Sequence, residues 1–314
     1  MTTPLEVLVL GGGPDAEREV SLVSSRAVFE ALDASAGCKA HYQVIDRVSG
    51  AQLAEMPGRV IFPVLHGGFG EGGPLQDLLV ADGRPFVGCG PSAARLAMDK
   101  LATKVAAARA GIPTLPCAVF NGADGGCPLP LPVVVKPVHE GSSVGVHFCH
   151  SEEEWSRAHA NVLADQAIHP RRAYLIERAL LGGRELTVGL LDGTALAPIE
   201  IRPAVAFYDY QAKYHSDETK YVPDPTLPAG VRDRIGSWSE LLFRELGCRH
   251  LARADFILDA QGQAWLLEIN TMPGFTGHSL LPMAAAHAGI SFEGLARRLV
   301  DLAIRDFPAR AHKD

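Results

Sequence analysis

The 314-residue sequence lacks the marks of several large classes of protein. It has no apolar run near the roughly 18 residues that a membrane-spanning helix needs, and no basic segment precedes an apolar one at its start. We therefore expect neither a membrane span nor a signal peptide. Basic residues are also outnumbered by acidic ones, 29 against 36, and the resulting net charge of −7 argues against nucleic acid as a partner. No C-x-x-C pair occurs among the six cysteines, which favours reduced thiols in a cytoplasmic protein over disulfides or a metal.

What is present is an ordinary soluble composition, with 47% hydrophobic and 21% charged residues, and a length that suggests two or three domains. Over the first 88 residues, short apolar segments alternate with helix-like ones, which predicts a parallel sheet with helices on its faces. Beyond that point we expect one long Ala-rich helix over 92–110 and a polar, aromatic functional loop over 207–225.

Two apolar segments, 254–258 and 264–269, predict a hairpin with a four-residue loop over 259–262, in which Arg253 lies opposite Glu268 and Asp255 opposite Leu266. Strand side chains alternate between faces, so one face is expected to carry Arg253, Asp255, Glu268 and Asn270. The opposite, core face is expected to carry Phe256, Leu258, Trp265, Leu267 and Ile269. The polar face has two interpretations: a solvated face with an ordinary salt bridge, or an oxygen-rich Mg²⁺ site beside an arginine that stabilises developing negative charge.

A second candidate is the segment 133–146, in which an apolar strand delivers Lys136 to a loop rich in glycine and serine. Such loops turn several backbone N–H groups toward one point and hold phosphates. The segment is not a Walker A motif, because the lysine precedes the glycines. Taken alone it is equally consistent with a flexible surface loop, but beside a separate Mg²⁺ face nucleotide binding is favoured.

Two further glycine-rich segments follow strands near the start of the chain. Residues 11–16 match the dinucleotide pattern G-x-G-x-x-A, but the nearby acids Asp15 and Glu17 would repel a pyrophosphate. We expect instead that these glycines admit a substrate to a helix N-terminus, where Glu17 binds an ammonium group. His66 opens the second segment, 66–73, and is equally consistent with a structural histidine and with a substrate contact.

Taken together, these segments resemble the D-alanine–D-alanine ligases of the ATP-grasp superfamily over essentially the whole chain. The resemblance rests on GGGPDAEREVSL, PVLHGGFGEGG, MDKLATK, VVVKPVHEGSSVGV, LIERALLGGRELTV, FYDYQAKYHSDETKY, RADFILD and LEINTMPGFTGHSLLP, in this order and spacing. It implies an α/β, ATP-grasp fold with an N-terminal parallel α/β domain over 1–88. A central lobe over 89–183 and a C-terminal, metal-binding lobe over 184–314 would enclose the nucleotide.

The resemblance also implies a reaction. ATP phosphorylates the carboxylate of one D-alanine, and the amino group of a second D-alanine attacks the acylphosphate, which releases D-alanyl-D-alanine, ADP and phosphate for peptidoglycan precursor synthesis. The protein's part is to position the reactants and neutralise charge. Two Mg²⁺ (or Mn²⁺) ions, a homodimer and a cytoplasmic location are implied with it.

Site residues are implied at the matching positions. For the nucleotide they are Lys100, Lys136, Glu177, Glu185, Phe207 and Lys213. For the two metal ions they are Asp255, Glu268 and Asn270. For the substrates and the chemistry they are Glu17, His66, Ser142, Tyr214, Arg253, Gly274, Ser279 and Leu280. Among these, Glu17 resembles the ammonium contact of the first substrate, and Ser279 and Leu280 resemble the carboxylate site of the second.

The sequence departs from the family pattern in two places. Gly72 stands where an acid usually follows Glu71, and the stretch between Glu177 and Glu185 is one residue longer than in some members. Two alternatives remain. One is an ATP-grasp ligase that joins another acid and amine or makes a D-alanine–D-lactate depsipeptide, and the neutral Tyr214 argues against the depsipeptide. The other is a non-enzymatic nucleotide-binding or dehydrogenase-like protein, against which the metal-binding residues argue.

Overall fold

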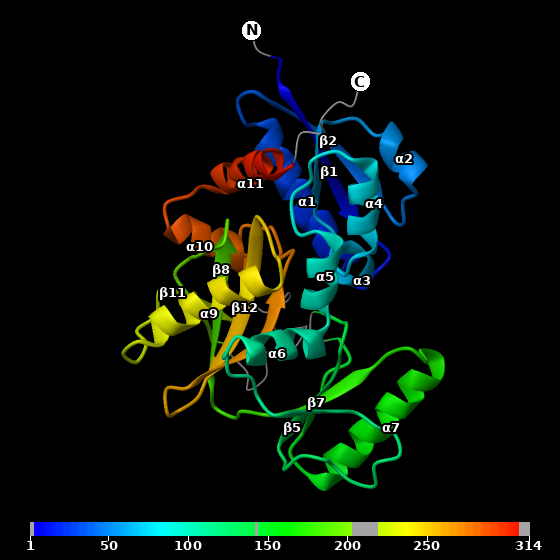
Figure 1. The fold of residues 1–314 in the computed structure, drawn as a ribbon, viewed down its shortest axis with the longest axis vertical. Coiled ribbons are helices and arrows are strands. Elements are labelled where there is room, and N and C mark those ends of the chain that lie inside the picture. Colours follow the sequence, from blue (N-terminus) through cyan, green and yellow to red (C-terminus); the bar gives the residue numbers. More distant parts are fainter. Residues whose placement is uncertain (1–2, 142–143, 203–218, 308–314) are drawn as a thin grey trace.

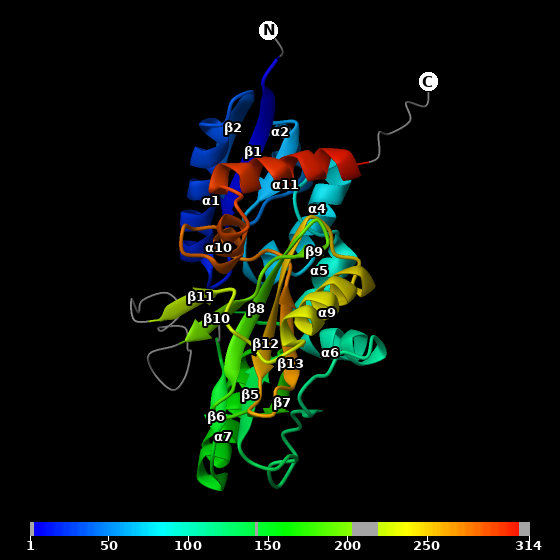
Figure 2. The same cartoon turned by 90° about the vertical axis from the view of Figure 1, so that its left-hand side faces the viewer.

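The computed structural model describes residues 3–141, 144–202 and 219–307, and over this part the strands form three sheets. Figure 1 shows the sheet built from the start of the chain at one end of the long axis. The sheet that contains β5 and β7 lies at the other end, and the sheet that contains β8 and β12 lies between them. Figure 2 gives the same order from the side.

The first sheet is parallel, as predicted. Its central strand β1 (Leu5–Gly12) pairs with β2 (Cys38–Ile45) on one side and with β3 (Val60–Pro63) on the other. The surrounding helices are α1 (Arg18–Asp33), α2 (Gly50–Glu55), α3 (Gly67–Gly70) and α4 (Pro74–Asp82).

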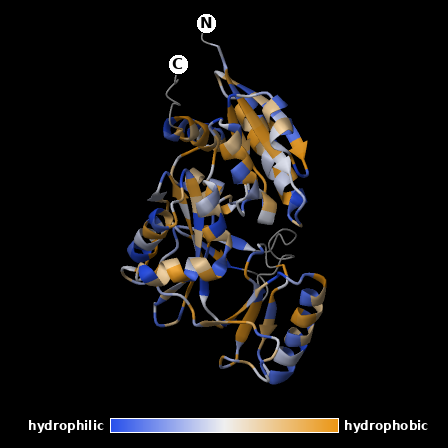
Figure 3. Cartoon of the chain, turned by 45° about the vertical axis from the view of Figure 1, so that its right-hand side comes forward, coloured by the Kyte–Doolittle hydropathy of each residue, from blue (hydrophilic) through white to orange (hydrophobic). Residues whose placement is uncertain are grey.

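The central strand of this sheet is apolar on both faces, because both faces are covered. Val7 and Val9 pack in one core with helix α1 and with α11 (Phe292–Asp306), the last helix of the described chain. Leu8 and Leu10 pack in another core with residues of α2 and α4. A continuous apolar run is the expected pattern for a strand buried on two sides. Figure 3 shows this apolar colour along the strands of the first sheet.

The other two sheets are antiparallel. One has the order β4-β7-β5-β6 and is covered by a helix; its elements are β4 (Cys117–Val119), β5 (Val133–Pro137), β6 (His147–Cys149), α7 (Glu152–Ile168) and β7 (Tyr174–Arg178). The other has the order β11-β10-β8-β12-β13, with β9 paired to β8. Its elements are β8 (Arg184–Leu191), β9 (Thr194–Ala195), β10 (Ile199–Arg202), β11 (Lys220–Pro223), α9 (Val231–Glu245), β12 (Leu251–Leu258), β13 (Ala264–Asn270) and α10 (Leu280–His287). Strand β11 lies within the segment predicted as loop over 207–225, so that part of the prediction is wrong.

The prediction of one helix over 92–110 is also wrong, because the helix is broken at Asp99. Helix α5 (Pro91–Met98) ends there, and α6 (Lys100–Arg109) begins at the next residue. Asp99 has an extended ψ of 103°, and its carboxylate accepts hydrogen bonds from the backbone N–H groups of Leu101 and Ala102 at 2.9 and 3.0 Å. An aspartate that caps new N–H donors is a favoured helix start.

The predicted hairpin is present with a different register. Arg253 lies opposite Asn270 and Asp255 opposite Glu268, and a bulge then places Phe256 opposite Leu266. The physical reason lies in the turn. The carboxylate of Asp259 accepts from the backbone N–H groups of Gln261 and Gln263 at 3.0 and 2.8 Å and from the indole N–H of Trp265 at 3.0 Å, and these bonds extend the loop to Gln263.

The register change alters the core face but keeps the polar one. Ala264 and Leu266 pack in the core with Phe256 and Leu258, where Trp265 and Leu267 were predicted. The residue added at the bulge, Leu267, lines a cavity on the polar side of the hairpin. The four predicted polar side chains still share one face, since the pairs 253–270 and 255–268 both lie on the same side of the bulge.

Candidate active site

A cavity of about 650 Å³ lies between the two antiparallel sheets, within the usual size range of small-molecule sites. Strands β5 and β7 supply one wall, and β8, β12 and β13 supply the other. The predicted residues that line it are Lys100, Lys136, Glu177, Glu185, Arg253, Asp255, Glu268 and Leu280. Apolar side chains complete the walls, among them Val134, Phe148, Leu186 and Phe256. Residues from distant parts of the sequence therefore meet in one charged, half-apolar space.

Glu177 is held between two lysines on the cavity wall. Lys136 Nζ donates to Glu177 Oε2 at 2.6 Å, and Lys104 forms an ion pair with the other carboxylate oxygen. Burial disfavours the charge on Lys136, but the attraction of Glu177 outweighs it and raises the pKa of Lys136. Burial likewise opposes ionisation of Glu177, yet the two lysines lower its pKa. The carboxylate therefore stays ionised and holds both cations in place.

Sequence reasoning missed Lys104, which supports the site through its ion pair with Glu177. Only 5% of the residue is exposed, and its ammonium group also donates to the carbonyl oxygen of Leu115 at 3.1 Å. A signal was available, because Lys104 follows Lys100 by four residues in an Ala-rich helix and the two therefore lie on one face.

The polar face of the hairpin presents oxygen ligands to the cavity. Arg253 donates from Nε and Nη2 to the two carboxylate oxygens of Asp255 at 2.9 and 2.7 Å, and the Thr187 hydroxyl donates to Asp255 Oδ1 at 2.6 Å. Glu268 lies opposite Asp255, with one oxygen 3.3 Å from Lys100 Nζ.

This donor set fits a hard divalent cation, which prefers carboxylate and amide oxygens. In the part of the chain that the structure describes, no group of three or more His, Cys, Asp and Glu side chains could hold a metal ion. A three-residue metal site on this face therefore needs the amide oxygen of Asn270, which accepts from the Met272 N–H at 2.9 Å.

The first sheet brings a second set of ionisable groups together. Glu17 lies at the start of α1 with 9% of the residue exposed, and a Cβ placed on Gly141 would stand 3.0 Å from its Oε2. His66 donates from Nδ1 to the Met272 carbonyl at 3.0 Å, and burial lowers its pKa although the charge of Glu17 opposes the shift. This proton position leaves Nε2 as an acceptor, and Nε2 is buried without a hydrogen-bond partner among the described residues.

Glu71 completes this set and was not among the predicted site residues. Burial, and after it the charge of Glu17, raise the pKa of Glu71 to about 8. The neighbouring Gly72 departs from the family pattern, and here the local packing demands glycine. A Cβ at this position would come within 2.4 Å of the Gly68 carbonyl oxygen. Glu71 belongs to the motif PVLHGGFGEGG, but the motif does not indicate that its side chain is buried.

The loop between β13 and α10, together with the first residue of α10, carries three predicted substrate residues. Ser279 Oγ accepts from the Thr276 N–H at 2.9 Å, and a Cβ on Gly274 would lie 2.9 Å from that oxygen. Leu280 begins α10 and lines the cavity. The buried hydrogen bond from the Phe275 N–H to Ser24 Oγ, 3.1 Å long, fastens this loop to α1.

The glycines at 11–13 are packed against the protein's own atoms rather than opened to a ligand. A Cβ on Gly11 would stand 2.0 Å from Ser25 Oγ, and one on Gly12 would stand 2.4 Å from the Ile45 carbonyl oxygen. Asp15 accepts from the Phe69 N–H at 2.8 Å and so is used within the fold. These contacts explain the motif without a dinucleotide.

Four predicted site residues, Ser142, Phe207, Lys213 and Tyr214, lie outside the described residues. Their assigned roles stay predictions.

Two antiparallel sheets that close over a lysine- and carboxylate-lined cavity, with a parallel α/β unit at one end, define the chain as an ATP-grasp enzyme. A solved structure with this arrangement, the D-alanine–D-alanine ligase from Bacillus anthracis complexed with ATP, matches the chain with a TM-score of 0.80 and 28% identity. The match covers 97% of this chain and 98% of that one.

The sequence comparisons narrow the class to one family. A family model described as the C-terminus of D-ala D-ala ligase matches residues 125–301. The D-alanine–D-alanine ligase of Methylacidiphilum infernorum is 37% identical over 95% of each chain. That of Citrifermentans bemidjiense is 41% identical over 95% of this chain and 96% of its own length. The chain belongs to the D-alanine–D-alanine ligase family. Among its described residues, no helix is long and apolar enough to span a membrane.

Proposed function

We propose that this chain joins two D-alanine molecules at the expense of ATP, through a D-alanyl phosphate, to give D-alanyl-D-alanine, ADP and phosphate for peptidoglycan precursor synthesis. The observation that carries the proposal is the meeting of Lys100, Lys136, Arg253, Asp255 and Glu268 in one cavity between two sheets. A carboxylate is a poor electrophile, and phosphorylation supplies the leaving group that an attacking amine requires.

The lysines and the arginine of the cavity each neutralise a different negative group of the reactants. Lys100 and Lys136 neutralise ATP phosphate oxygens, and Glu177 keeps Lys136 in place through the 2.6 Å hydrogen bond. Glu185 contacts the ribose and Glu177 the adenine side of the nucleotide. Arg253 stabilises the negative charge that develops on the attacked carbonyl oxygen, as a preorganised donor does in a water-poor site.

The first D-alanine binds at the edge of the first sheet. Glu17 is a buried carboxylate and binds the substrate ammonium group. His66 supports this position through Nε2, which is an acceptor because Nδ1–H donates to Met272. Ser142 and Tyr214 hydrogen-bond with this substrate and close over it, with Phe207 and Lys213 on the nucleotide side. The Gly274 region assists Arg253 in stabilising the developing negative charge, and Ser279 and Leu280 form the carboxylate site of the second D-alanine.

Asp255, Glu268 and Asn270 would hold two Mg²⁺ (or Mn²⁺) ions. When bound, such ions supply positive charge beside the transferring phosphoryl group. The chain's own contribution is orientation: the Thr187 hydroxyl and the Arg253 guanidinium fix the Asp255 carboxylate, and Lys100 accompanies Glu268. We further propose a cytoplasmic homodimer, and a division into units at 1–88, 89–183 and 184–314 in which α11 returns to the first unit.

Coupled ADP release tests the proposal. Purified protein with ATP and Mg²⁺ is assayed with D-alanine, L-alanine, other D-amino acids and D-lactate, and the products are separated by mass. We expect ADP and D-alanyl-D-alanine in equal amounts with D-alanine, and little turnover with L-alanine. Equimolar D-alanine and D-lactate at neutral pH should give mainly the dipeptide, because Tyr214 carries no positive charge. Mainly depsipeptide would move the assignment to a D-alanine–D-lactate ligase, and ADP release independent of D-alanine would refute the ligase assignment.

A further inference from the structure

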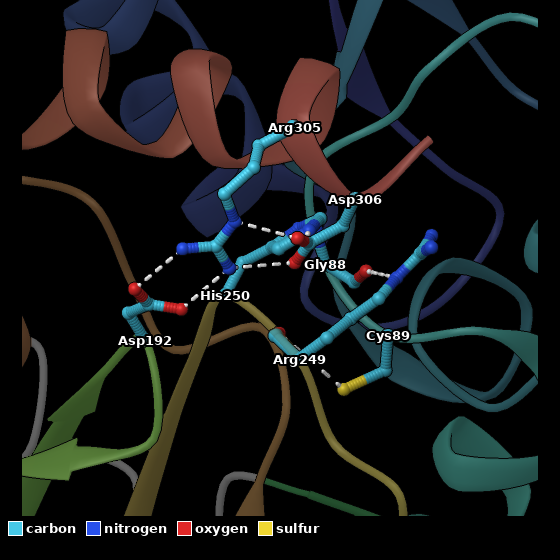
Figure 4. A network of polar contacts seen from close by, with 7 residues as sticks. All are labelled: Gly88, Cys89, Asp192, Arg249, His250, Arg305 and Asp306. Atoms are coloured by element: carbon cyan, nitrogen blue, oxygen red, sulfur yellow. Dashed lines mark hydrogen bonds and ion pairs between the residues drawn. The ribbon is translucent and has the colours of Figure 1, made fainter. Parts of the chain in front are cut away.

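A further polar cluster lies where four segments of the chain meet, and Figure 4 shows it from close by. We call this cluster the junction. It consists of Gly88 and Cys89 after the first sheet, Asp192 in the turn between β8 and β9, Arg249 and His250 before β12, and Arg305 and Asp306 at the end of α11.

Gly88 is held at both of its backbone polar groups by consecutive side chains. Its N–H donates to His250 Nδ1 at 3.0 Å, and its carbonyl oxygen accepts from Arg249 Nε at 2.7 Å. The Arg249 guanidinium also lies over the Phe86 ring, 4.4 Å from the centroid. These contacts tie the end of the first sheet directly to the residues that precede β12.

His250 has an unfavourable backbone conformation, which the contacts around it must stabilise. It is 1% exposed and has a φ of +66°, which costs energy for any residue with a side chain. Its carbonyl oxygen accepts from the Asp192 N–H at 2.7 Å, while Asp192 binds both terminal nitrogens of Arg305 at 2.8 Å. The backbone of His250 is therefore held by Asp192, and its ring is held by Gly88.

The protonation state of His250 follows from the same contacts. Because the Gly88 N–H is a donor, Nδ1 must carry the lone pair and Nε2 the proton, and Nε2 lies 3.4 Å from Asp306 Oδ2. Burial, with the positive charge of Arg249 after it, lowers the pKa of His250 to about 4. The ring is neutral near pH 7 and acts there as an acceptor for Gly88.

The junction is linked to both halves of the proposed substrate site, along the chain to β12 and through Met272 to His66. Strand β12 begins one residue after His250 and carries Arg253. On the other side, a Cβ on Gly88 would lie 3.0 Å from Met272 Cε, and the Met272 carbonyl accepts from His66. A shift of Gly88 relative to His250 would therefore alter the separation of His66 and Glu17 from Arg253.

We propose that His250 is a positioning residue for the ligation, which by holding Gly88 sets the first sheet, with Glu17 and His66, at the correct place relative to Arg253. The inference rests on the proposed function, since these three residues are assigned there to D-alanine and its acylphosphate. The nucleotide contacts Lys136 and Glu177 stand on a different sheet and do not depend on Gly88.

Three substitutions at His250 separate positioning from stability. Asparagine places Oδ1 where His250 has Nδ1 and tolerates a positive φ, so it keeps the acceptor. Alanine removes the acceptor, and glutamine places its polar atoms one bond too far along. In His250→Ala and His250→Gln we expect kcat/KM for D-alanine to fall roughly 10- to 100-fold, the scale of a displacement of about 1 Å. The Kd for ATP should stay within about twofold, and His250→Asn should recover kcat/KM to within about threefold of wild type.

The matched control is Arg84→Gln. Arg84 donates to the carbonyl oxygens of Met56 and Gly58 at 2.8 and 3.0 Å within the first unit only. It should lower stability without changing kcat/KM per folded molecule. A wild-type value of kcat/KM in folded His250→Ala would overturn the inference. Equal losses of kcat/KM in His250→Asn and His250→Gln would also overturn it, and this second comparison can be made even if His250→Ala does not fold.

A crystal structure of His250→Gln tests the same inference without turnover. We expect the first sheet to be displaced relative to β12 by about 1 Å. Superposable sheets would refute the positioning role whether or not the wild type acts on D-alanine. Absence of D-alanine-dependent ADP release from the wild type would instead refute the proposed function.

Discussion

Two buried glutamates at the site show how the surroundings of one residue type decide its charge. Glu177 stands between Lys104 and Lys136, which lower its pKa in spite of burial. Glu71 is buried beside another acid, Glu17, and its pKa is raised to about 8. The first is a permanent anion that organises cations, and the second holds a proton near neutral pH.

Glu268→Gln tests the role of a proposed metal ligand. Because a bound cation contributes several kcal/mol to transition-state stabilisation, we expect kcat to fall by roughly 100-fold or more. The fold should remain, since the side chain is 30% exposed and belongs to no core. The measurements are coupled ADP release in saturating Mg²⁺ and thermal unfolding, with the exposed Glu293→Gln as control. Turnover close to wild type would remove Glu268 from the metal site.

Glu71→Gln tests the raised pKa through stability. The folded pKa of about 8 lies above the ordinary value of 4.5, so the folded protein holds a proton that the unfolded chain releases. This stabilisation is complete below about pH 4.5 and is lost as the pH rises through about 8. The unfolding free energy of wild type minus that of the variant should therefore fall, by on the order of a few kcal/mol, between about pH 5 and pH 8.

Urea unfolding at a series of pH values measures this difference, with the exposed Glu55→Gln as control. A difference that is constant over the range would show that Glu71 ionises normally.

At the scale of elements, the break between α5 and α6 places one lysine on the cavity wall and a second lysine against Glu177, which lines the same wall. Since α6 begins at Lys100, Lys100 and Lys104 stand one turn apart on the same face. The first lies 3.3 Å from Glu268 and the second is paired with Glu177. The Lys100 N–H also donates to the Val138 carbonyl at 3.2 Å, which joins the helix start to the end of β5. A single unbroken helix would place these two side chains elsewhere.

Asp99→Ala tests the cap that creates this break. Loss of an N-cap costs about 1 kcal/mol, so we expect a small fall in stability. KM for ATP should rise several-fold, because Lys100 is the first residue of the loosened helix. Asp99→Ser retains a capping oxygen and should restore both values. Urea unfolding measures the stability, and ATP titration of the activity measures KM. An unchanged KM in Asp99→Ala would show that the cap does not influence the nucleotide site.

At the scale of the whole molecule, the last helix completes the core of the first sheet. Leu295, Leu299 and Val300 of α11 are fully buried in the same core as Val7 and Val9 of β1. Figure 2 shows α11 crossing over the first sheet beside α1. Glu17 and His66, the proposed substrate residues at the edge of that sheet, therefore depend on a segment that lies between 226 and 289 positions away along the chain.

Leu299→Ala tests this dependence. Removal of a fully buried leucine side chain costs roughly 2–5 kcal/mol, so the urea midpoint should fall strongly. Ile304→Ala on the same helix is the control. Ile304 is 41% exposed, and the cost should be less than about 1 kcal/mol. Similar losses in the two variants would mean that α11 does not close the first core.

The sequence alone determined the parts of this protein that depend on local periodicity. The alternation of strands and helices predicted the parallel first sheet, and the two-residue period of a strand predicted the shared face of Arg253, Asp255, Glu268 and Asn270. The family motifs indicated Lys100, Lys136, Glu177 and Glu185, which the structure brings to one cavity. These features follow from residue order because neighbours along one strand or helix face have fixed relative directions.

Only the tertiary structure decided the hairpin register, the burial of Glu71, the pairing of Lys104 with Glu177 and the hold of His250 on Gly88. The register depended on three bonds accepted by Asp259 and on one extra residue at the bulge. The other three bring together Glu71 with Glu17, Lys104 with Glu177 and His250 with Gly88, pairs that lie 54, 73 and 162 positions apart, where the sequence carries no periodic signal. The physical reason is that burial and charge pairing depend on which surfaces meet in space, and this is settled only when the sheets pack together.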